Sequence, residues 1–471
     1  MTKELAIHTT DIPGLLIIDL PVHGDNRGWF KENWQREKMV VLGLPDFGPV
    51  QNNISFNASR GTTRGIHAEP WNKFVSVAHG RIFGAWVDLR AGESFGATVT
   101  VELGPDTAVF VPRGVGNSFQ TLEDNTAYTY VVNDHWSADA QDEYSFLNLA
   151  DETVGIHWPI PLEQAELSDK DKNHPRLAEV NPVHPAPLLI VGSGGQLGKE
   201  LVRQLTEREI PFIAASREDI DLAQPDKWLN KYRWRSIRAI INAAAYTAVD
   251  QAENVQGRVD AWAANATGVA ALASVATEAN IPLVHVSTDY VFDGSLPRGE
   301  EYSVDASLAP LGVYGQSKAA GEMAARAVPQ HYIVRTSWVI GEGKNFVETM
   351  KSLAERGVNP AVVGDQFGRL TFTEDLAGAI LHLVENQCEF GTYHVSNSGD
   401  VLSWFDVATK VFELTGNDPA RVSATTTAEY FANAELFAPR PANSALDLSK
   451  IIEAGFEPRE QVSALKEYLS Y

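Results

Sequence analysis

The chain is poor in cysteine, in basic residues and in long apolar runs. Its one cysteine, Cys388, excludes an intrachain disulfide and favours a reducing compartment. Lysine and arginine number 38 against 61 acidic residues, giving a formal net charge of -23. This balance argues against nucleic-acid or anionic-membrane partners, because phosphate groups are held by clustered cations. No stretch of about 20 apolar residues predicts a membrane span, so we expect a soluble cytoplasmic protein.

The length of 471 residues exceeds the roughly 250 to 300 that one hydrophobic core supports, so several domains are expected. Residues 50–135 alternate apolar and polar side chains between Gly-containing turns, which predicts an antiparallel barrel or jelly roll. From residue 188 onward, strands alternate with helices, a pattern typical of a doubly wound parallel sheet. We expect an all-β domain over residues 1–172, a proline-rich linker over 173–187, and an α/β Rossmann domain with a small substrate lobe over 188–471.

A glycine-rich turn begins the second domain. Gly192, Gly195 and Gly198 are spaced G-x-x-G-x-x-G after an apolar strand and at the start of an amphipathic helix. That context suits a dinucleotide, whose pyrophosphate needs a tight turn and a helix N-terminus. Arg217 follows the second strand where NAD-selective sites often place a carboxylate, so NADPH would be tolerated as well as NADH; a solvated surface arginine is the alternative.

A tyrosine and a lysine lie four residues apart in the same domain. Tyr314 and Lys318 in YGQSK share one helix face. A cation beside a phenol favours the phenolate, so the pair could give a proton to a carbonyl while hydride arrives from a nicotinamide. Thr288, at the end of a predicted strand, offers a hydroxyl that could orient the same carbonyl.

Several blocks of the second domain resemble the dTDP-4-dehydrorhamnose reductases, which are extended short-chain dehydrogenases. They are VGSGGQLG, INAAAYTAVDQAE, VSTDYVFDG, LGVYGQSKAAGE, VRTSWVIGEGKNFV and DQFGRLTFTEDLA. The resemblance implies catalytic roles for Thr288, Tyr314 and Lys318, and places Asp289, Tyr290 and Trp338 around the sugar. The expected cofactor site comprises Gly192, Gly195, Gln196, Leu197, Gly198, Arg217, Asp221, Ala243, Ala244, Tyr314 and Lys318.

The first domain carries a histidine and a lysine close together in RGIHAEPWNK. His67 could remove a proton alpha to a ketone, and Lys73 could stabilise the resulting enolate. A lone histidine in a β protein is more often structural. However, GDNRGWFKENW, QNNIS, RGIH, NKFV, VDLRAGESFGA, VPRGVGNSF and DETVGIHWP resemble, in this order, the dTDP-4-dehydrorhamnose 3,5-epimerases, which are cupin jelly rolls.

That second resemblance implies His67 as the general base, Asp151 as its dyad partner and Lys73 as the enolate stabiliser. The residues expected to hold the substrate are Arg27, Glu32, Gln51, Asn53, Arg64 and Asn117. Arginines suit a diphosphate through bidentate pairing, although surface salt bridging is the alternative for Arg27 and Arg64 in so acidic a chain.

Two positions depart from the epimerase pattern. Trp136 in NDHW stands where the family has the tyrosine that acts as its catalytic acid. An indole N–H cannot replace a phenol as that proton donor. Asn117 in GVGNSF stands at a family histidine. The proton donor would then be His135, Tyr130, Tyr128 or water, or the site is slow, altered in regiochemistry or inactive. No metal is expected, because the cupin His-x-His pair is absent and too few ligands remain.

The sequence thus predicts a bifunctional enzyme that epimerises a dTDP-linked 4-keto-6-deoxy sugar without a cofactor and then reduces it with NADPH or NADH. One alternative keeps the reductase and makes the cupin a nucleotide-sugar binding or dimerisation module. Another treats the chain as a non-catalytic regulatory subunit. The epimerase resemblance also implies a homodimer formed through the cupin domain.

Overall fold

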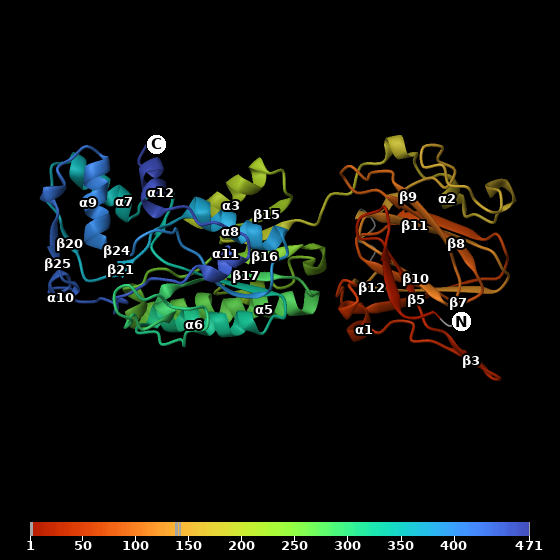
Figure 1. The fold of residues 1–471 in the computed structure, drawn as a ribbon, viewed down its shortest axis with the longest axis horizontal. Helices are drawn as coiled ribbons and strands as arrows, with labels where there is room; N and C mark the ends of the chain where they lie inside the picture. Colours follow the sequence, from red (N-terminus) through yellow and green to blue (C-terminus); the bar gives the residue numbers. More distant parts are fainter. Residues whose placement is uncertain (1–2, 137–139, 141–142, 471) are drawn as a thin grey trace. The chain divides into compact units, whose positions relative to one another are not determined.

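A computed structural model describes residues 3–136, 140 and 143–470. The chain divides into two compact units, Met1–Pro185 and Ala186–Tyr471, and Figure 1 colours the first from red to yellow and the second from yellow-green through green to blue. Among the residues described, no helix is both long and apolar enough to cross a membrane. Each unit has its own hydrophobic clusters.

Two antiparallel sheets build the first unit, as the cupin jelly-roll prediction requires. The strands of the larger sheet, in spatial order, are β1 (Ala6–Thr9), β2 (Leu16–Asp19), β10 (Thr107–Val111), β7 (Lys73–His79), β12 (Thr126–Val132) and β5 (Gln51–Asn57). Those of the other sheet are β13 (Ser145–Phe146), β6 (Thr63–Ala68), β11 (Val115–Thr121), β8 (Ile82–Asp88) and β9 (Thr98–Leu103). A short hairpin, β3 (His23–Asp25) and β4 (Gly28–Phe30), lies outside both.

The core of this unit is formed by inward-facing side chains from both sheets. Val75 and Val109 belong to the larger sheet, Trp86 and Phe119 to the other, and all four are buried in one cluster. The central strand β7 is buried along most of its length, whereas the edge strand β5 alternates between more and less exposed positions. This difference follows from position, since a central strand is covered on both faces and an edge strand is not.

The structure differs from the expected linker over 173–187. Leu177 and Val180 are buried in a cluster of the first unit, and Val183 exchanges backbone hydrogen bonds with the Leu89–Ala91 segment. The prolines of this stretch keep its backbone extended, but its apolar side chains pack against the first unit. Residues 173–185 therefore belong to the first unit, and the second unit begins at Ala186.

A six-stranded parallel sheet forms the centre of the second unit, confirming the Rossmann-type prediction. Its strands in spatial order are β15 (Phe212–Ala215), β14 (Leu188–Val191), β16 (Ala239–Asn242), β17 (Leu283–Thr288), β18 (His331–Thr336) and β23 (Gly391–His394). The chain reverses its direction of winding at β14, and ligands of such sheets bind where the strands end beside that point.

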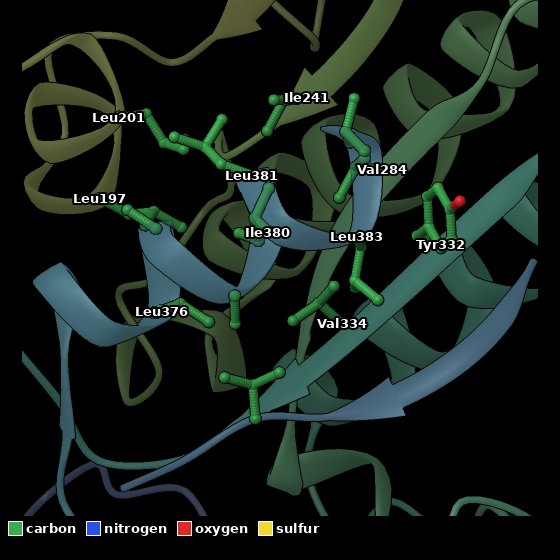
Figure 2. Packing of buried hydrophobic residues seen from close by; sticks show 14 of the residues in the cluster. Leu197, Leu201, Ile241, Val284, Tyr332, Val334, Leu376, Ile380, Leu381 and Leu383 are labelled. Atoms are coloured by element: carbon green, nitrogen blue, oxygen red, sulfur yellow. The ribbon is translucent and has the colours of Figure 1, made fainter. Parts of the chain in front are cut away.

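Helices cover both faces of this sheet (Figure 1). On one face, α3 (Gln196–Glu207) and α8 (Thr373–Glu385) pack leucines and isoleucines against β14, β16, β17 and β18, as Figure 2 shows. On the other, α5 (Gly268–Ala279) and α6 (Val313–Arg326) contribute small and branched side chains. The helix α4 (Val255–Trp262) precedes α5 through a π-helical turn.

A smaller lobe uses residues from the last part of the chain. Its apolar cluster joins α7 (Phe346–Glu355), α9 (Trp404–Leu414) and α12 (Gln461–Tyr468). Short strand pairs accompany it, β20 (Ala361–Val363) with β25 (Ser423–Thr425) and β21 (Phe367–Gly368) with β24 (Leu402–Ser403). The lobe carries Trp338 and Trp404 to one end of the parallel sheet.

Candidate active sites

A cavity of about 1080 Å³ lies in the first unit, between β6, β7, β11 and β12 and the segment after β13. Four of the residues expected at the site line it: Arg64, His67, Lys73 and Asn117. Strand β13, the residue before it and the segment after it add side chains that were not expected from the sequence. They are Tyr144, Phe146, Glu166, Leu167, Ser168, Lys170, Asp171, Asn173 and His174.

His67 forms its hydrogen bond with Asp171, at 3.0 Å between Nε2 and Oδ1. Asp171 lies on the short helix α2 (Asp169–Lys172), whose first turn is capped by the Ser168 hydroxyl. Burial by itself would raise the pKa of Asp171, but the hydrogen bond and charge of His67 outweigh it and lower the pKa. Asp171 is thus an anion at neutral pH that can fix the orientation of the His67 ring and stabilise its protonated form.

The structure corrects the expectation that Asp151 is the partner of His67. The Asp151 carboxylate accepts backbone N–H bonds from Thr153, Val154 and Leu177. Those bonds, opposed by burial, lower its pKa. Asp151 therefore holds a turn and anchors the stretch that was expected to be a linker. Because Asp171 lies outside the quoted motifs, the sequence pattern gave no sign of it.

Lys73 is buried at the wall of the cavity, next to the carboxylate of Glu69. Its ammonium lies 5.3 Å from the ring centre of Tyr130. Burial lowers the pKa of Lys73 to about 7, since removing an ammonium from water penalises its charged form. A cation held in this way can stabilise an anion that forms beside it.

The two departures from the epimerase pattern both face the cavity. Asn117 accepts hydrogen bonds from Trp86 Nε1 at 2.9 Å and from the Tyr128 hydroxyl at 3.1 Å, and Trp136 contributes to the lining. Of the donors considered, Tyr128 and Tyr130 line the cavity, whereas His135, which the structure describes, does not. Burial raises the pKa of both tyrosines, so both phenols are protonated at neutral pH.

Four residues expected to hold the substrate lie outside the lining of this cavity. Arg27 pairs with Asp25 on the β3–β4 hairpin and Glu32 pairs with Lys38, both exposed. Gln51 donates to Asn53 on the edge strand β5. In the part of the chain that the structure describes, none of these four residues lines the cavity that contains His67.

The sequence suggested too few ligands for a metal ion, but the fold brings three of them together. His67, Asp171 and His174 bring one ligand atom each to within 4.8 Å of one another. This group could not be predicted from the sequence, because Asp171 and His174 lie more than a hundred residues beyond His67. His174 also falls in the stretch expected to be a linker.

A second cavity, of about 970 Å³, lies in the second unit at the ends of β14, β16 and β17. Every cofactor residue expected from the sequence lines it except Gly198. Gly192 has a φ of +85°, and a Cβ there would come within 2.8 Å of Ala244. A Cβ on Gly198 would lie 2.1 Å from the Gly192 carbonyl oxygen. The turn is therefore tight, and the N-cap of α3, Gly195, provides no side-chain cap, which leaves N–H groups for a pyrophosphate.

At the end of β15, Arg217 and Asp221 face the same cavity. Their side chains approach to 3.8 Å, and the Arg217 side chain is largely exposed. Asp221 accepts from the backbone of Ala223 and the side chain of Gln224. The exposed Arg217 side chain can therefore bind a phosphate, whereas the Asp221 side chain is fixed by its hydrogen bonds.

Thr288, Tyr314 and Lys318 all line this cavity. Burial, together with the charge of Asp289, raises the pKa of Tyr314 despite a hydrogen bond with Thr288. The phenol is therefore a neutral proton donor at physiological pH. The sequence argument expected Lys318 to favour the phenolate, but the Lys318 ammonium donates to the Val286 carbonyl at 2.6 Å.

His285 contacts Lys318 and is itself held by Asn242, and neither residue was expected at the site from the sequence. His285 Nε2 lies 3.5 Å from the Lys318 ammonium, and Asn242 contacts the other ring nitrogen at 3.1 Å. Burial and the Lys318 charge lower the pKa of His285 far below its usual value, so His285 is neutral. Burial lowers the pKa of Lys318 itself to about 8. A polar histidine within the apolar strand LVHVST was the available signal.

The expected sugar residues also line the second cavity. Asp289 is buried between the hydroxyls of Thr288 and Ser444, and burial raises its pKa to about 6. The rings of Tyr290 and Tyr314 meet edge to face. Trp338 has a φ of +47° and stacks on Trp404 with ring centres 3.7 Å apart, which presents a flat apolar wall to the cavity.

Comparisons with known proteins assign both units. The family described as "RmlD substrate binding domain" matches residues 186–471, and the family "dTDP-4-dehydrorhamnose 3,5-epimerase" matches residues 9–179. A "Protein RmlC homolog" of Streptococcus pyogenes is 50% identical over 183 residues, which are 38% of this chain and 92% of the relative.

The second unit also matches relatives over nearly their whole length. A dTDP-4-dehydrorhamnose reductase of Aggregatibacter actinomycetemcomitans is 39% identical over 301 residues, covering 61% of this chain and 99% of the relative. The crystal structure of a dTDP-4-dehydrorhamnose reductase of Bacillus anthracis in complex with NADP is 33% identical with a TM-score of 0.55, covering 61% of this chain and 99% of that one.

Proposed function

Because this chain belongs to the RmlD reductase family over residues 186–471 and to the dTDP-4-dehydrorhamnose 3,5-epimerases over residues 9–179, we propose that it carries out two consecutive reactions. The first unit epimerises carbons 3 and 5 of dTDP-4-dehydro-6-deoxy-D-glucose. The second reduces the 4-ketone of the product, giving dTDP-L-rhamnose. The single observation that carries the proposal is that each unit encloses a cavity lined by its own proton-transfer groups.

In the first unit, His67 acts as the general base. Its imidazole takes a proton from a carbon alpha to the 4-ketone, and the Asp171 carboxylate stabilises the imidazolium that forms. The Lys73 ammonium stabilises the enolate. Tyr130 returns a proton to the opposite face, supported by its place in the cavity wall beside Lys73 and by its protonated phenol.

In the second unit, Tyr314 gives its proton to the 4-keto oxygen while Thr288 orients that oxygen. The Lys318 ammonium, fixed by Val286 and His285, stabilises the phenolate that remains. The glycine turn and the free N-terminus of α3 fit the pyrophosphate of a nicotinamide cofactor. When bound, NADPH or NADH supplies the hydride. The exposed Arg217 supports use of NADPH, as does the NADP bound to the Bacillus anthracis relative.

The sugar and nucleotide are held by residues in the walls of the cavities. In the second unit these are Asp289, Tyr290 and Trp338; in the first, Arg64 and Asn117 contribute. We assign Arg27 and Glu32 to the substrate site of a second copy, because they lie on exposed segments outside the cavity of their own copy. Gln51 and Asn53 share the face of β5 with Ser55, which lines the cavity, so we assign them to the edge of their own site. The single Cys388 supports a cytoplasmic location.

A homodimer formed through the first unit accounts for an otherwise exposed surface. Ile54 and Phe56 on the edge strand β5 are 69% and 60% exposed, and Trp29 and Phe30 on β4 are also exposed. An edge strand with large apolar side chains is a template for pairing with another chain. A second copy seated here would cover these side chains.

The test is a two-stage assay on the full chain. In D₂O without cofactor, the protein should exchange the substrate hydrogens at carbons 3 and 5, as followed by NMR. Adding NADPH should then give dTDP-L-rhamnose. An unepimerised reduced sugar without exchange would show that the first unit only binds nucleotide sugars or dimerises. Absence of both reactions would favour the regulatory alternative.

The pH dependence of the reduction is expected to report on Lys318. Burial lowers its pKa from 10.5 to about 8, so the ammonium is present below that pH and lost above it. The kcat/KM for reduction should therefore fall about tenfold per unit above pH 8. NADPH oxidation measured from pH 6 to 10 checks this, with thermal unfolding at each pH to exclude loss of the fold. A flat profile to pH 10 would contradict it.

A further inference from the structure

Two histidines share one carboxylate in the cavity of the first unit. Asp171 Oδ1 lies 3.0 Å from His67 Nε2 and 3.9 Å from His174 Nε2. The side chains of Asp171 and His174 are mostly buried, and His67 is about one third exposed toward the cavity. The proposed epimerisation uses His67 and Asp171 and leaves His174 without a role.

Aromatic packing fixes the His174 ring in this place. It stacks on Phe146 with ring centres 4.8 Å apart and meets the His67 ring edge to face at 5.3 Å. Phe146 also contacts the His67 ring at 5.5 Å. Phe146 thus contacts both imidazoles, whose Nε2 atoms both lie near Oδ1 of Asp171. The Nδ1 atom of His174 is buried without a hydrogen-bond partner.

The spacing of these atoms fits a small divalent ion. Zinc binds imidazole nitrogen and carboxylate oxygen at about 2.0 to 2.2 Å, so its tetrahedral ligands lie roughly 3.3 Å from one another. The three ligand atoms here lie within 4.8 Å of one another, and the two histidine nitrogens lie 3.0 and 3.9 Å from the carboxylate oxygen, close to that spacing. Two histidines and a carboxylate, with a fourth position open to the cavity, form a typical donor set for zinc.

We propose that His67, Asp171 and His174 bind one Zn²⁺ ion, and that the bound ion blocks the epimerase site. Binding through Nε2 breaks the His67–Asp171 hydrogen bond, because the ion takes the lone pair of that nitrogen. The remaining proton of the neutral ring is then on Nδ1, so neither nitrogen of His67 can accept a proton from a substrate. The inhibition rests on the proposed function of His67 as the base, whereas the binding of the ion does not.

The second unit provides an internal control for this inhibition. The His67–Asp171–His174 group is in the first unit, and the Tyr314 site is in the other. Zinc at one equivalent should therefore stop solvent exchange at carbons 3 and 5 while leaving the reduction of a sugar that is already epimerised unchanged.

The test measures zinc affinity directly, on the full chain freed of metal by a chelator. Competition with a chromophoric zinc chelator is compared for the wild type, His174→Phe and a matched control, His184→Phe, whose histidine is exposed and outside the group. Phenylalanine keeps the stacking on Phe146 but offers no ligand. His174→Gln serves as a second variant if the melting temperature of His174→Phe falls.

The wild type and His184→Phe should bind one zinc ion at least about tenfold more tightly than His174→Phe, since one of three ligands is lost. Zinc should abolish exchange in the wild type and spare it in His174→Phe. Equal zinc affinity in all proteins would overturn the metal site. If the zinc-free wild type shows no exchange, the proposed epimerase function fails, while the affinity comparison still decides the metal site.

Discussion

Replacing Tyr314 with Phe is expected to slow reduction of the 4-ketone by about 10²- to 10⁴-fold, the usual contribution of a positioned proton donor. The variant keeps the ring that meets Tyr290 edge to face and removes the hydroxyl that is hydrogen-bonded to Thr288. Because the phenol is buried and its pKa is raised, it is a neutral donor across the assay range, and the variant lacks that donor. NADPH oxidation with epimerised substrate measures the loss.

Two controls show whether the loss concerns the chemistry. Binding of NADPH to the Tyr314→Phe protein, followed by fluorescence, should change little, because the glycine turn and α3 are untouched. Solvent exchange at carbons 3 and 5 should proceed at the wild-type rate, since it occurs in the other unit. Unchanged turnover would remove Tyr314 from the mechanism and support the regulatory alternative.

Replacing His67 with Asn is expected to reduce solvent exchange at carbons 3 and 5 by about 10²- to 10⁴-fold. The amide cannot accept the substrate proton, although it can still contact Asp171. Reduction of a sugar that is already epimerised should continue, so the overall reaction stops at its first step. NMR in D₂O and product analysis with NADPH measure the two parts separately. Exchange at the wild-type rate would transfer the role of base to another group.

Asp171 and Asp151 provide a matched pair for testing the dyad. Asp171→Asn removes the anion that faces His67 and should slow exchange by about 10- to 10³-fold with little change in stability. Asp151→Asn weakens the set of backbone N–H bonds from Thr153, Val154 and Leu177 and should lower the free energy of unfolding of the first unit by about 1–3 kcal/mol. The reverse result would restore Asp151 as the partner of His67.

The two sites differed in how well the sequence predicted them, and the reason is physical. In the second unit, the cofactor turn, the Thr288 strand end and the Tyr314–Lys318 helix face are each set by local sequence. A parallel sheet brings the ends of its strands together at one edge, so these local motifs meet in one cavity. The contact of His285 with Lys318, and that of Asn242 with His285, depend on neighbouring strands and could not be predicted locally.

In the first unit, the site combines β6 with a segment more than a hundred residues later. Nothing in the spacing of residues 151, 171 and 174 indicates which of them reaches His67, because antiparallel strands and extended loops place distant residues together only after folding. The prolines and mixed pattern of residues 173–187 predicted a linker. The structure instead packs Leu177 and Val180 into an apolar cluster, which carries Asp171 and His174 to the cavity.

The sequence by itself therefore determined a good deal. The two strand patterns determined the class of both domains, and the short motifs determined the two chemistries and most of the groups in the reductase site. The scarcity of cysteine excluded an intrachain disulfide, and that of basic residues argued against nucleic-acid partners. Only the tertiary structure decided that Asp171 is the partner of His67, that Asp151 holds a turn, and that His174 completes a group of possible metal ligands. Local sequence fixes backbone pattern and side-chain chemistry, but the pairing of a buried carboxylate is decided by which segments cover the sheet.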